Sequence, residues 1–362
     1  MTDLSKHLEV VGIDIGGANI KVSRLDGLSA SCQFPMWTDY RRLGSAIDEL
    51  LKHLNINFSE NTCLALTMTG EMADCFNSRR EGVAAILDGV TSVIPSQRIW
   101  IYAVGGEWLR VEQAKQNSWQ VAASNWHALV SWLLLQDEWQ VKNCDLVLDI
   151  GSTTVDIIPL RHGQIATGAK TDRQRMQLGQ LVYTGAGTHC HSGNGARIAS
   201  GGETCPVIAE KFTSLDLHLI LHTVAEDPQN CDTADGKPRS RHFALARLAR
   251  MVGEDTETIG EHEVVSLANQ ILEAQAVQII KALLRNLPSN TDRNRNGNRQ
   301  IFVSGHGRPI IERMQVKSEL ADVNWLMLDE LVSPLASRCA PALAVAQLLQ
   351  KQLIKQFNGW TS

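Results

Sequence analysis

The sequence predicts an α/β fold built from two domains. Strand-like apolar runs alternate along the chain with segments whose apolar residues recur at helical spacing. A length of 362 residues, 44% of them hydrophobic, is enough for a sizeable core divided between about two domains. A third observation is a repeat, in which an apolar strand ending in Asp-Ile-Gly is followed by small residues and a second strand. This pattern occurs at 9–25 and again at 144–160.

The first half of the chain alternates strands with helices. We expect, in order, a strand, turn and strand over 9–25, a helix over 43–55, a strand over 63–72, a strand over 96–108 and a helix over 125–136. The strand over 63–72, CLALTMTGEM, ends in polar residues and a glycine. Glu71 is the charged residue among them, so we expect it at the end of a buried strand.

The second half begins with the repeated strand, turn and strand over 144–160. A long helix lies within 253–287, and its apolar stripe is formed by Val264, Leu267, Ile271, Ala274, Ile279 and Leu283. A solvated loop over 291–300, a strand over 301–307 and a closing helix over 341–356 follow. We place one domain at 1–143 and the other at 144–362, and leave open whether the closing helix packs back on the first.

Composition and charge exclude several classes of protein. The net charge is -5 and no basic stripe is interleaved with aromatic residues, so we expect no nucleic-acid partner. The N-terminal MTDLSKHLEV has no apolar signal-peptide core, and the apolar stretch WHALVSWLLLQ is far shorter than the ~20 residues of a membrane span. We therefore expect a cytoplasmic protein with no membrane partner, and leave a homo-oligomer open.

The eight cysteines include no CxxC pair, so we expect free thiols. His189, Cys190, His191 and Cys205 are capable of binding a metal, but their spacing includes no CxxC or HxxxH pair. A Gly/Ser-rich surface loop is the preferred interpretation of this segment.

The repeated hairpin predicts a phosphate site. A tight glycine turn between antiparallel strands lets backbone N–H groups point into one concavity, and such nests bind phosphate. The expected contacts are Gly16, Gly17, Asn19 and Lys21 in the first copy, and Gly151, Ser152, Thr153 and Thr154 in the second. A carboxylate beside each turn would repel phosphate unless a divalent cation lay between them, so we expect Asp14 and Asp149 to bind Mg²⁺, mostly through water. One such hairpin alone is more often a simple glycine turn, and its recurrence favours the phosphate site.

The pair of hairpins resembles the phosphate loops of the actin-like ATPase superfamily, and the chain is similar to hydantoinase/oxoprolinase-like proteins in this respect. The resemblance implies two ribonuclease-H-like domains with an interdomain phosphate-binding cleft. It also implies that a late strand ending in glycines approaches an adenosine, and VSGHG places Gly305 and Gly307 at that point. Such a fold does not determine the reaction.

Five stretches carry a closer resemblance. They are GIDIGGANIK, LTMTGEMADCFNSRREGV, LVLDIGSTTVDIIP, YTGAGTHC and DTADGKPRSRHFALARLARMVGED. Together they resemble the tetrahydromethanopterin-linked one-carbon-transfer proteins, whose archaeal members are similar to an enzyme of methanofuran biosynthesis. The resemblance implies a transferase in which the phenol of γ-glutamyltyramine displaces diphosphate from an aminomethylfuranylmethyl diphosphate and forms an aryl ether.

The same resemblance suggests roles for individual residues. The phenol would benefit from a general base, for which Glu71 is the first candidate, Asp74 the second and Asp156 the third. Asp235 and Lys237 are candidates for contacts to the amine or glutamyl end of the substrates. The structural alternatives are a helix-capping carboxylate for Glu71 and a solvated loop for the other two.

One segment departs from the family pattern. After YTG the chain continues AGTHCHSGNGARIASGGETCPV, which contains an insertion and lacks the arginine expected there. Either Arg197 substitutes for that arginine or the substrate differs, so the exact substrate is left open.

Two other functions are compatible with the hairpins. An ATP-dependent kinase or ATPase would bind ATP in the same cleft, although His306 between Gly305 and Gly307 argues weakly against a purine pocket. A non-catalytic nucleotide or metabolite sensor would need a partner-binding domain, for which the sequence offers no further segment.

Overall fold

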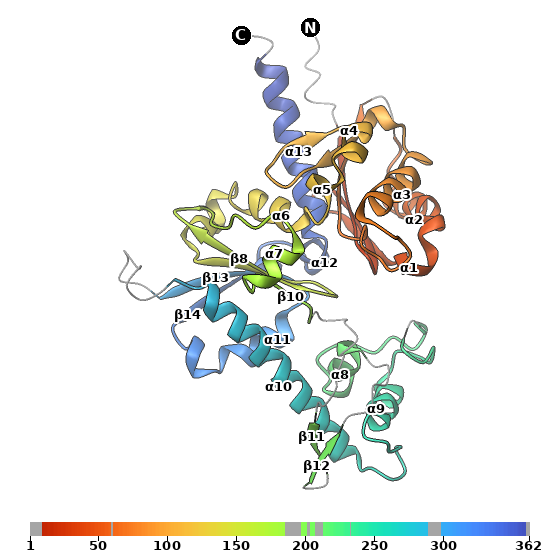
Figure 1. Ribbon diagram of the computed structural model, residues 1–362, viewed down its shortest axis with the longest axis vertical. Coiled ribbons are helices and arrows are strands. Elements are labelled where there is room, and N and C mark those ends of the chain that lie inside the picture. The colour runs from red at the N-terminus through yellow and green to blue at the C-terminus, as the bar shows by residue number, and fades with distance from the viewer. Residues whose placement is uncertain are drawn as a thin grey trace.

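The computed structural model describes residues 9–58, 61–184, 197–200, 203–206, 213–231, 233–288 and 298–359. Its strands form two mixed sheets and a small ribbon made of β11 (Arg197–Ser200) and β12 (Glu203–Pro206). Helices cover both sheets, so the expected α/β fold class is confirmed (Figure 1). Among the helices of the described ranges, none combines the length and the apolar character that a membrane span requires.

The first sheet has the strand order β3-β2-β1-β4-β5-β6. Its strands are β1 (Glu9–Ile15), β2 (Asn19–Arg24), β3 (Ser29–Gln33), β4 (Thr62–Met68), β5 (Ile99–Tyr102) and β6 (Trp108–Leu109). β1 and β2 form an antiparallel hairpin, and β4 runs parallel to β1 on its other side. β4 ends earlier than predicted, so Glu71 lies in the loop that follows it rather than at the strand end.

The second sheet repeats this arrangement in the order β10-β8-β7-β13-β14, with β9 (Gln164–Ile165) paired to β8. Its strands are β7 (Leu146–Ile150), β8 (Val155–Arg161), β10 (Leu181–Val182), β13 (Arg299–Gly305) and β14 (Val323–Met327). β7 and β8 form the second hairpin, and β13 runs parallel to β7. The two hairpins share one register, because Asp14 pairs with Lys21 where Asp149 pairs with Asp156.

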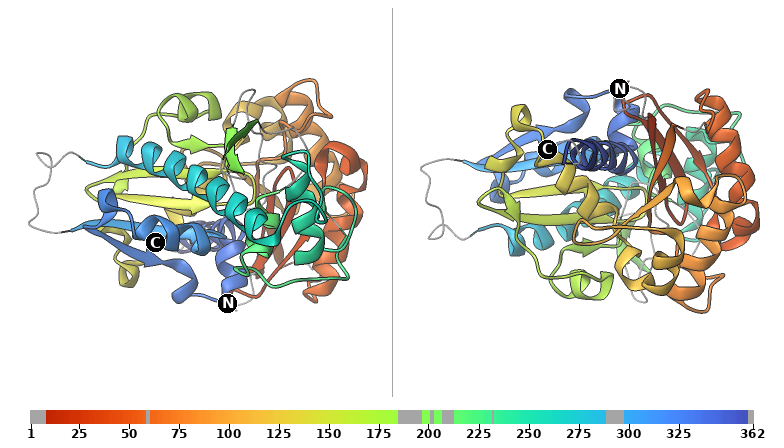
Figure 2. Two further views of the ribbon diagram at one scale, coloured as in Figure 1. Left: turned by 90° about the horizontal axis from the view of Figure 1, so that it is seen from below. Right: turned by 90° about the horizontal axis from the view of Figure 1, so that it is seen from above.

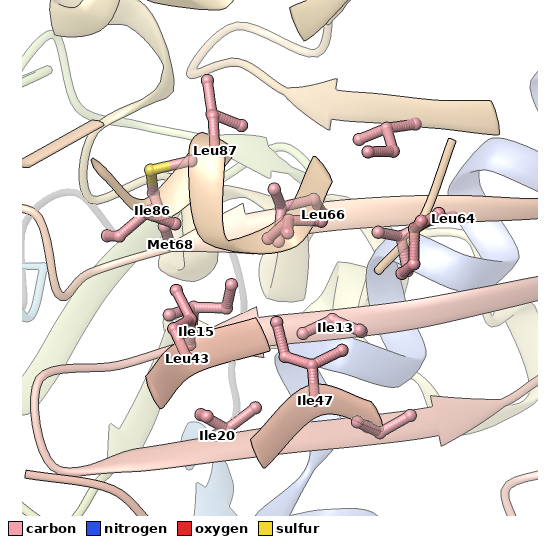
Figure 3. Close-up of a cluster of buried hydrophobic side chains, with 14 of the residues drawn as sticks. Ile13, Ile15, Ile20, Leu43, Ile47, Leu64, Leu66, Met68, Ile86 and Leu87 are labelled. Atoms are coloured by element: carbon pink, nitrogen blue, oxygen red, sulfur yellow. The ribbon is translucent and has the colours of Figure 1, made fainter. Parts of the chain in front are cut away.

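Helices α2 (Leu43–His53) and α3 (Arg79–Thr91) cover one face of the first sheet. Figure 3 shows Ile13 and Leu66 of the sheet beside Ile47 of α2 and Leu87 of α3. α3 begins where the Ser78 side chain accepts a hydrogen bond from the Glu81 N–H, which satisfies one of the free donors of the first turn. Three short helices complete this region: α1 (Met36–Asp39), α4 (Val111–Gln116) and α5 (Ser118–Val121).

Two helices, α6 (Asn125–Leu133) and α13 (Ala340–Gly359), lie between the sheets (Figure 2). α6 packs Leu129 against Phe302 of the second sheet, while α13 packs Val345 against Val10 of the first. β1 approaches α13 so closely that a Cβ at Gly12 would lie 1.8 Å from the backbone oxygen of Ala342. The closing helix therefore packs on the first sheet, while the domain boundary near residue 143 stays a prediction.

The long helix α10 (Glu261–Asn286) contributes to two cores. Its C-terminal half packs Ala276, Ile279 and Leu283 under the second sheet. Its N-terminal half forms a separate helical unit with α8 (Ser214–Ile220) and α9 (Arg241–Arg250), seen at the bottom of Figure 1. Between the halves, Ala274 of the predicted apolar stripe is exposed. The remaining helices are α7 (Asp172–Gln177), α11 (Arg308–Gln315) and α12 (Pro334–Arg338).

Candidate active site

One large cavity, about 1110 Å³ in volume, lies where the two hairpins, the loop after β4, the segment from α7 to β10 and one face of α10 meet. Most of the residues predicted from the hairpins line it. They are Asp14, Gly16, Gly17, Asn19, Lys21, Asp149, Gly151, Ser152, Thr153, Thr154 and Asp156, and Asp74 lines it as well. Residues that are far apart in the sequence thus converge on a single space.

The two hairpin turns have the same backbone geometry and touch each other. The Gly16 N–H donates to the Asn19 carbonyl at 2.9 Å, and the Gly151 N–H donates to the Thr154 carbonyl at 2.9 Å. Across the cavity, the Asn19 side-chain amide donates to the Ser152 hydroxyl at 3.1 Å. A Cβ at Gly17 would meet no atom within 4 Å, so this turn leaves open space for a ligand to approach the backbone.

Asp14 and Lys21 form a buried charged pair in the first hairpin. Lys21 Nζ lies 3.5 Å from Asp14 Oδ2, while Asp14 Oδ1 is buried with no hydrogen-bond partner in the described part of the chain. Burial raises the pKa of Asp14, and Lys21 partly opposes that rise. Burial also acts to lower the pKa of Lys21, but the charges of Asp14 and Asp149 outweigh it and the pKa is raised. Lys21 therefore remains a cation beside the turn.

The second hairpin contains a carboxylate, Asp156, at the position of Lys21, and a buried arginine compensates for it. Arg175 of α7 donates from Nη1 to Asp156 Oδ1 at 2.5 Å, and its guanidinium carbon lies 4.4 Å from the centre of the Trp126 ring. Burial, followed by the charge of Asp156, raises the pKa of Asp149 to about 6. Because its charge is already paired, Asp156 is a weaker candidate for the base than the sequence suggested.

Glu71 is buried directly beside the cavity. Only 1% of its surface is exposed, its Oε2 has no hydrogen-bond partner among the described residues, and the neighbouring Met72 and Ala123 both line the cavity. Burial raises the pKa of Glu71 to about 7, and nearby Asp172 adds to the rise. A carboxyl that is half ionised near neutral pH can exchange protons, which is the property that a general base requires. Asp74 differs from Glu71 because it is exposed and lines the cavity itself.

Gly305 and Gly307 are not among the residues that line the cavity. A Cβ at Gly305 would lie 2.3 Å from the Ile150 carbonyl oxygen, and one at Gly307 would lie 2.2 Å from Ile150 Cδ1. Both glycines therefore let β13 and the following turn pack against the end of β7. Between them, burial lowers the pKa of His306 to about 3, which keeps the imidazole neutral.

Asp235 and Lys237 also lie away from the cavity lining. Asp235 accepts a hydrogen bond from Arg247 Nη1 at 2.8 Å, and the same arginine pairs with the buried Asp216 at 2.6 Å. The position of Asp235 is explained by this ion-pair network in the helical unit, so the structure gives no support to its expected substrate contact.

The segment that departs from the family pattern adds nothing to the described site. His189, Cys190 and His191 lie outside the described residues, and Arg197 and Cys205 are described only as backbone, in β11 and β12.

The donor atoms of Asp14 and Asp149 fit a magnesium ion. Both carboxylates are buried at the cavity wall, and Asp14 Oδ1 lacks a partner among the described residues. Mg²⁺ commonly takes one or two protein carboxylates and fills its other positions with water and phosphate. The described ranges contain no group of three or more His, Cys, Asp or Glu side chains that could bind a metal. Magnesium itself stays a prediction.

Several cavity residues were not predicted from the sequence. Arg175 and Asp172 belong to α7, a short polar helix without an apolar stripe, and Tyr183 follows the two-residue strand β10. The apolar spacing of α10 did predict a helix, but gave no sign that Ile271 and Ala274 would face the cavity. Each of these residues reaches the site through tertiary contacts rather than through a local motif.

Comparison with known proteins places this chain in a family. A family model described as Hydantoinase/oxoprolinase matches residues 63–352. A (4-{4-[2-(gamma-L-glutamylamino)ethyl]phenoxymethyl}furan-2-yl)methanamine synthase from Methanocaldococcus jannaschii is 33% identical over 350 residues, which cover 96% of this chain and 99% of the relative. A synthase of the same name from Methanococcus vannielii is 29% identical over 221 residues, 60% of this chain and 95% of the relative.

Among solved structures, the nucleotide-free structure of an acetone carboxylase matches with a TM-score of 0.58. The match covers 94% of this chain and 70% of that chain at 11% identity, so it shows a shared fold and nothing about the reaction. The family model agrees with the hydantoinase/oxoprolinase-like resemblance, and the near full-length relative agrees with the closer resemblance carried by the five stretches. The chain belongs to the hydantoinase/oxoprolinase family.

Proposed function

We propose that this protein is a transferase that joins a phenol to a furanylmethyl group with release of diphosphate. The observation that supports this most is the 33% identity, over nearly the whole of both chains, to a synthase whose name describes a phenoxymethyl link to a furan. By this proposal the acceptor is γ-glutamyltyramine and the donor an aminomethylfuranylmethyl diphosphate. The product would serve in the synthesis of a methanofuran-type cofactor for one-carbon metabolism in the cytoplasm.

The reaction is a substitution at the furanylmethyl carbon. The phenol oxygen forms a bond to that carbon, the bond from the carbon to the diphosphate oxygen breaks, and the electron pair leaves with the diphosphate. A furan ring delocalises positive charge at the methylene, which favours a loose transition state. The main barrier is then the charge that accumulates on the departing diphosphate.

The two hairpins suit this leaving group. The turns line the cavity with open space at Gly17 and with the side chains of Asn19 and Ser152, and Lys21 adds a buried cation beside them. When bound by Asp14 and Asp149, Mg²⁺ would supply further positive charge to stabilise the departing diphosphate. Arg175 neutralises Asp156, so the second hairpin does not add an unpaired carboxylate at this position.

The phenol proton needs an acceptor, because the reference pKa of a phenol is about 10. We assign Glu71 to this role, since its pKa of about 7 leaves a useful fraction ionised at neutral pH. Asp74, exposed at the cavity wall, is the second candidate. The pH dependence of the Glu71→Gln and Asp74→Asn variants distinguishes the two, because only the loss of the true base removes the lower inflection of kcat/KM.

A product assay by mass spectrometry tests the proposal. Purified protein is incubated with Mg²⁺, γ-glutamyltyramine and the aminomethylfuranylmethyl diphosphate, and a parallel reaction contains ATP without the furan donor. We expect the aryl ether in the first reaction and no ADP in the second. ADP without any ether would overturn the transferase and favour a kinase or ATPase that uses the same hairpins. Asp14→Asn serves as the inactive control.

A further inference from the structure

Four large apolar side chains that are exposed to solvent line the cavity. Their exposed fractions are 47% for Trp37, 57% for Met72, 56% for Tyr183 and 37% for Val277. Exposed apolar side chains that gather in a concave site commonly mark a surface for an apolar ligand group. Neither phosphate nor a metal ion explains them, because both would bind to the polar hairpins.

The four side chains belong to two separate walls. On the first wall, Trp37 follows Met36, whose N–H donates to the Gly17 carbonyl at 2.9 Å. Met72 lies on the same side, in the loop after β4, whose Thr69 N–H donates to the Ile15 carbonyl at 2.8 Å. This wall is therefore bonded directly to the turn of the first hairpin.

The second wall is formed by Tyr183 and α10. The Gln275 side chain donates to the Thr184 carbonyl at 2.9 Å, which fixes the residue after Tyr183 to the helix. Ala274 and Val277 lie on the same part of α10, and both line the cavity. Since Ala274 has only a methyl group, the helix presents a shallow apolar surface beside the Tyr183 ring.

We propose that the Tyr183–α10 wall, made of Tyr183, Ala274 and Val277, binds the aromatic ring of the acceptor, and that the wall of Trp37 and Met72 binds the furan. This inference rests on the proposed function.

The first hairpin contains the Lys21 cation at the position where the second has Asp156, so it attracts the diphosphate more strongly. The furan is one methylene away from the diphosphate, so it lies beside the first hairpin, where Trp37 is located. Tyr183 follows β10, which pairs with β8 of the second hairpin, and the acceptor, which is not attached to the diphosphate, occupies that wall.

Substitutions in the two walls should each raise the KM for a different substrate. Tyr183→Ala removes an aromatic contact, and we expect the KM for γ-glutamyltyramine to rise roughly tenfold while the KM for the furanyl diphosphate changes less than about twofold. Tyr183→Phe should restore the wild-type KM, because the ring and not the hydroxyl makes the contact. Trp37→Ala should show the reverse pattern, with the larger rise for the furanyl diphosphate.

A filling substitution tests the second wall without removing any contact. Leucine is a good helix former, so Ala274→Leu should leave α10 intact while it occupies the space for the acceptor ring. We expect a similar rise in the KM for γ-glutamyltyramine. Lys281→Leu introduces the same side chain at an exposed position of α10 outside the cavity and should change neither KM. Trp119→Ala, also exposed at 54% but outside the cavity, is the matched control for Trp37→Ala.

Binding of tyramine, followed by saturation-transfer NMR, separates this inference from the proposed function. The wild type, Trp37→Ala and Trp119→Ala should give a tyramine signal, whereas Tyr183→Ala and Ala274→Leu should lose it, whether or not any ether is formed. If ether forms but Trp37→Ala, rather than Tyr183→Ala, raises the KM for the acceptor, the assignment of the walls is overturned. Equal tyramine binding by all the variants would also overturn it.

Discussion

Replacing Glu71 with glutamine should stabilise the protein at neutral and alkaline pH. Only 1% of the surface of Glu71 is exposed, and burial raises its pKa from 4.5 to about 7. A rise of this size corresponds to roughly 3 kcal/mol, because each pKa unit is worth about 1.4 kcal/mol. The folded protein therefore binds the proton more tightly than the unfolded chain does.

The sign of the effect follows from this difference in proton binding. Below pH 4.5 both states are protonated, and Glu71 imposes no penalty. Between pH 4.5 and about 7 the unfolded carboxyl ionises first, so the free energy of unfolding falls by up to roughly 3 kcal/mol, and above about 7 the loss stays constant. Glutamine cannot ionise, so the Glu71→Gln variant should escape this loss.

Urea unfolding, followed by tryptophan fluorescence at pH 5, 6, 7 and 8, measures the effect. The free energy of unfolding of Glu71→Gln minus that of the wild type should become more positive across this range, by roughly 2 to 3 kcal/mol. Glu49→Gln, which removes an exposed carboxylate from α2, provides the matched control and should show little change with pH. If the difference in free energy of unfolding between Glu71→Gln and the wild type does not vary with pH, the raised pKa of a buried Glu71 carboxyl is refuted. The same variant should lose the inflection near pH 7 in kcat/KM.

Three other substitutions test the hairpins and the core. Asp14→Asn should lower turnover at least about a hundredfold with an unchanged circular dichroism spectrum, because it removes a metal ligand beside the leaving group; near wild-type turnover would contradict the metal role. Asn19→Ala breaks the 3.1 Å hydrogen bond to the second hairpin and should lower the free energy of unfolding by about 1 kcal/mol. It should also raise the KM for the diphosphate donor. An unchanged KM would argue against binding of the diphosphate by both hairpins together. Gly12→Ala places a Cβ 1.8 Å from the Ala342 oxygen, and should lower the thermal midpoint by at least several degrees, while Gly17→Ala, with open space around it, should have a much smaller effect.

The parts of the structure that the sequence predicted correctly are those encoded locally. The Asp-Ile-Gly strands recur with the same apolar pattern, and their shared register, Asp14 with Lys21 and Asp149 with Asp156, follows from that repetition. The closing helix was predicted because its apolar residues recur at helical spacing.

The parts that the sequence did not reveal depend on long-range packing. Arg175 reaches Asp156 because α7 packs on β10, the strand that pairs with β8, and no periodicity in that polar helix indicates a buried charge. The apolar residues of α8 and α9 share one buried cluster with the N-terminal half of α10, and the local sequence does not show that these distant segments pack together. Asp235 looked like a substrate contact because the sequence does not show that Arg247 binds it.

The identity of the released phosphate tests the central claim most directly. The reaction contains Mg²⁺, γ-glutamyltyramine and the furanyl diphosphate, without ATP. A phosphorus NMR time course measures the inorganic diphosphate released, and mass spectrometry measures the ether formed. One diphosphate released for each ether formed, and neither product in the Asp14→Asn variant, is the predicted result. Ether that requires ATP, or release of orthophosphate instead of diphosphate, would show that the hairpins bind a nucleotide tail and would contradict the diphosphate-displacing transferase.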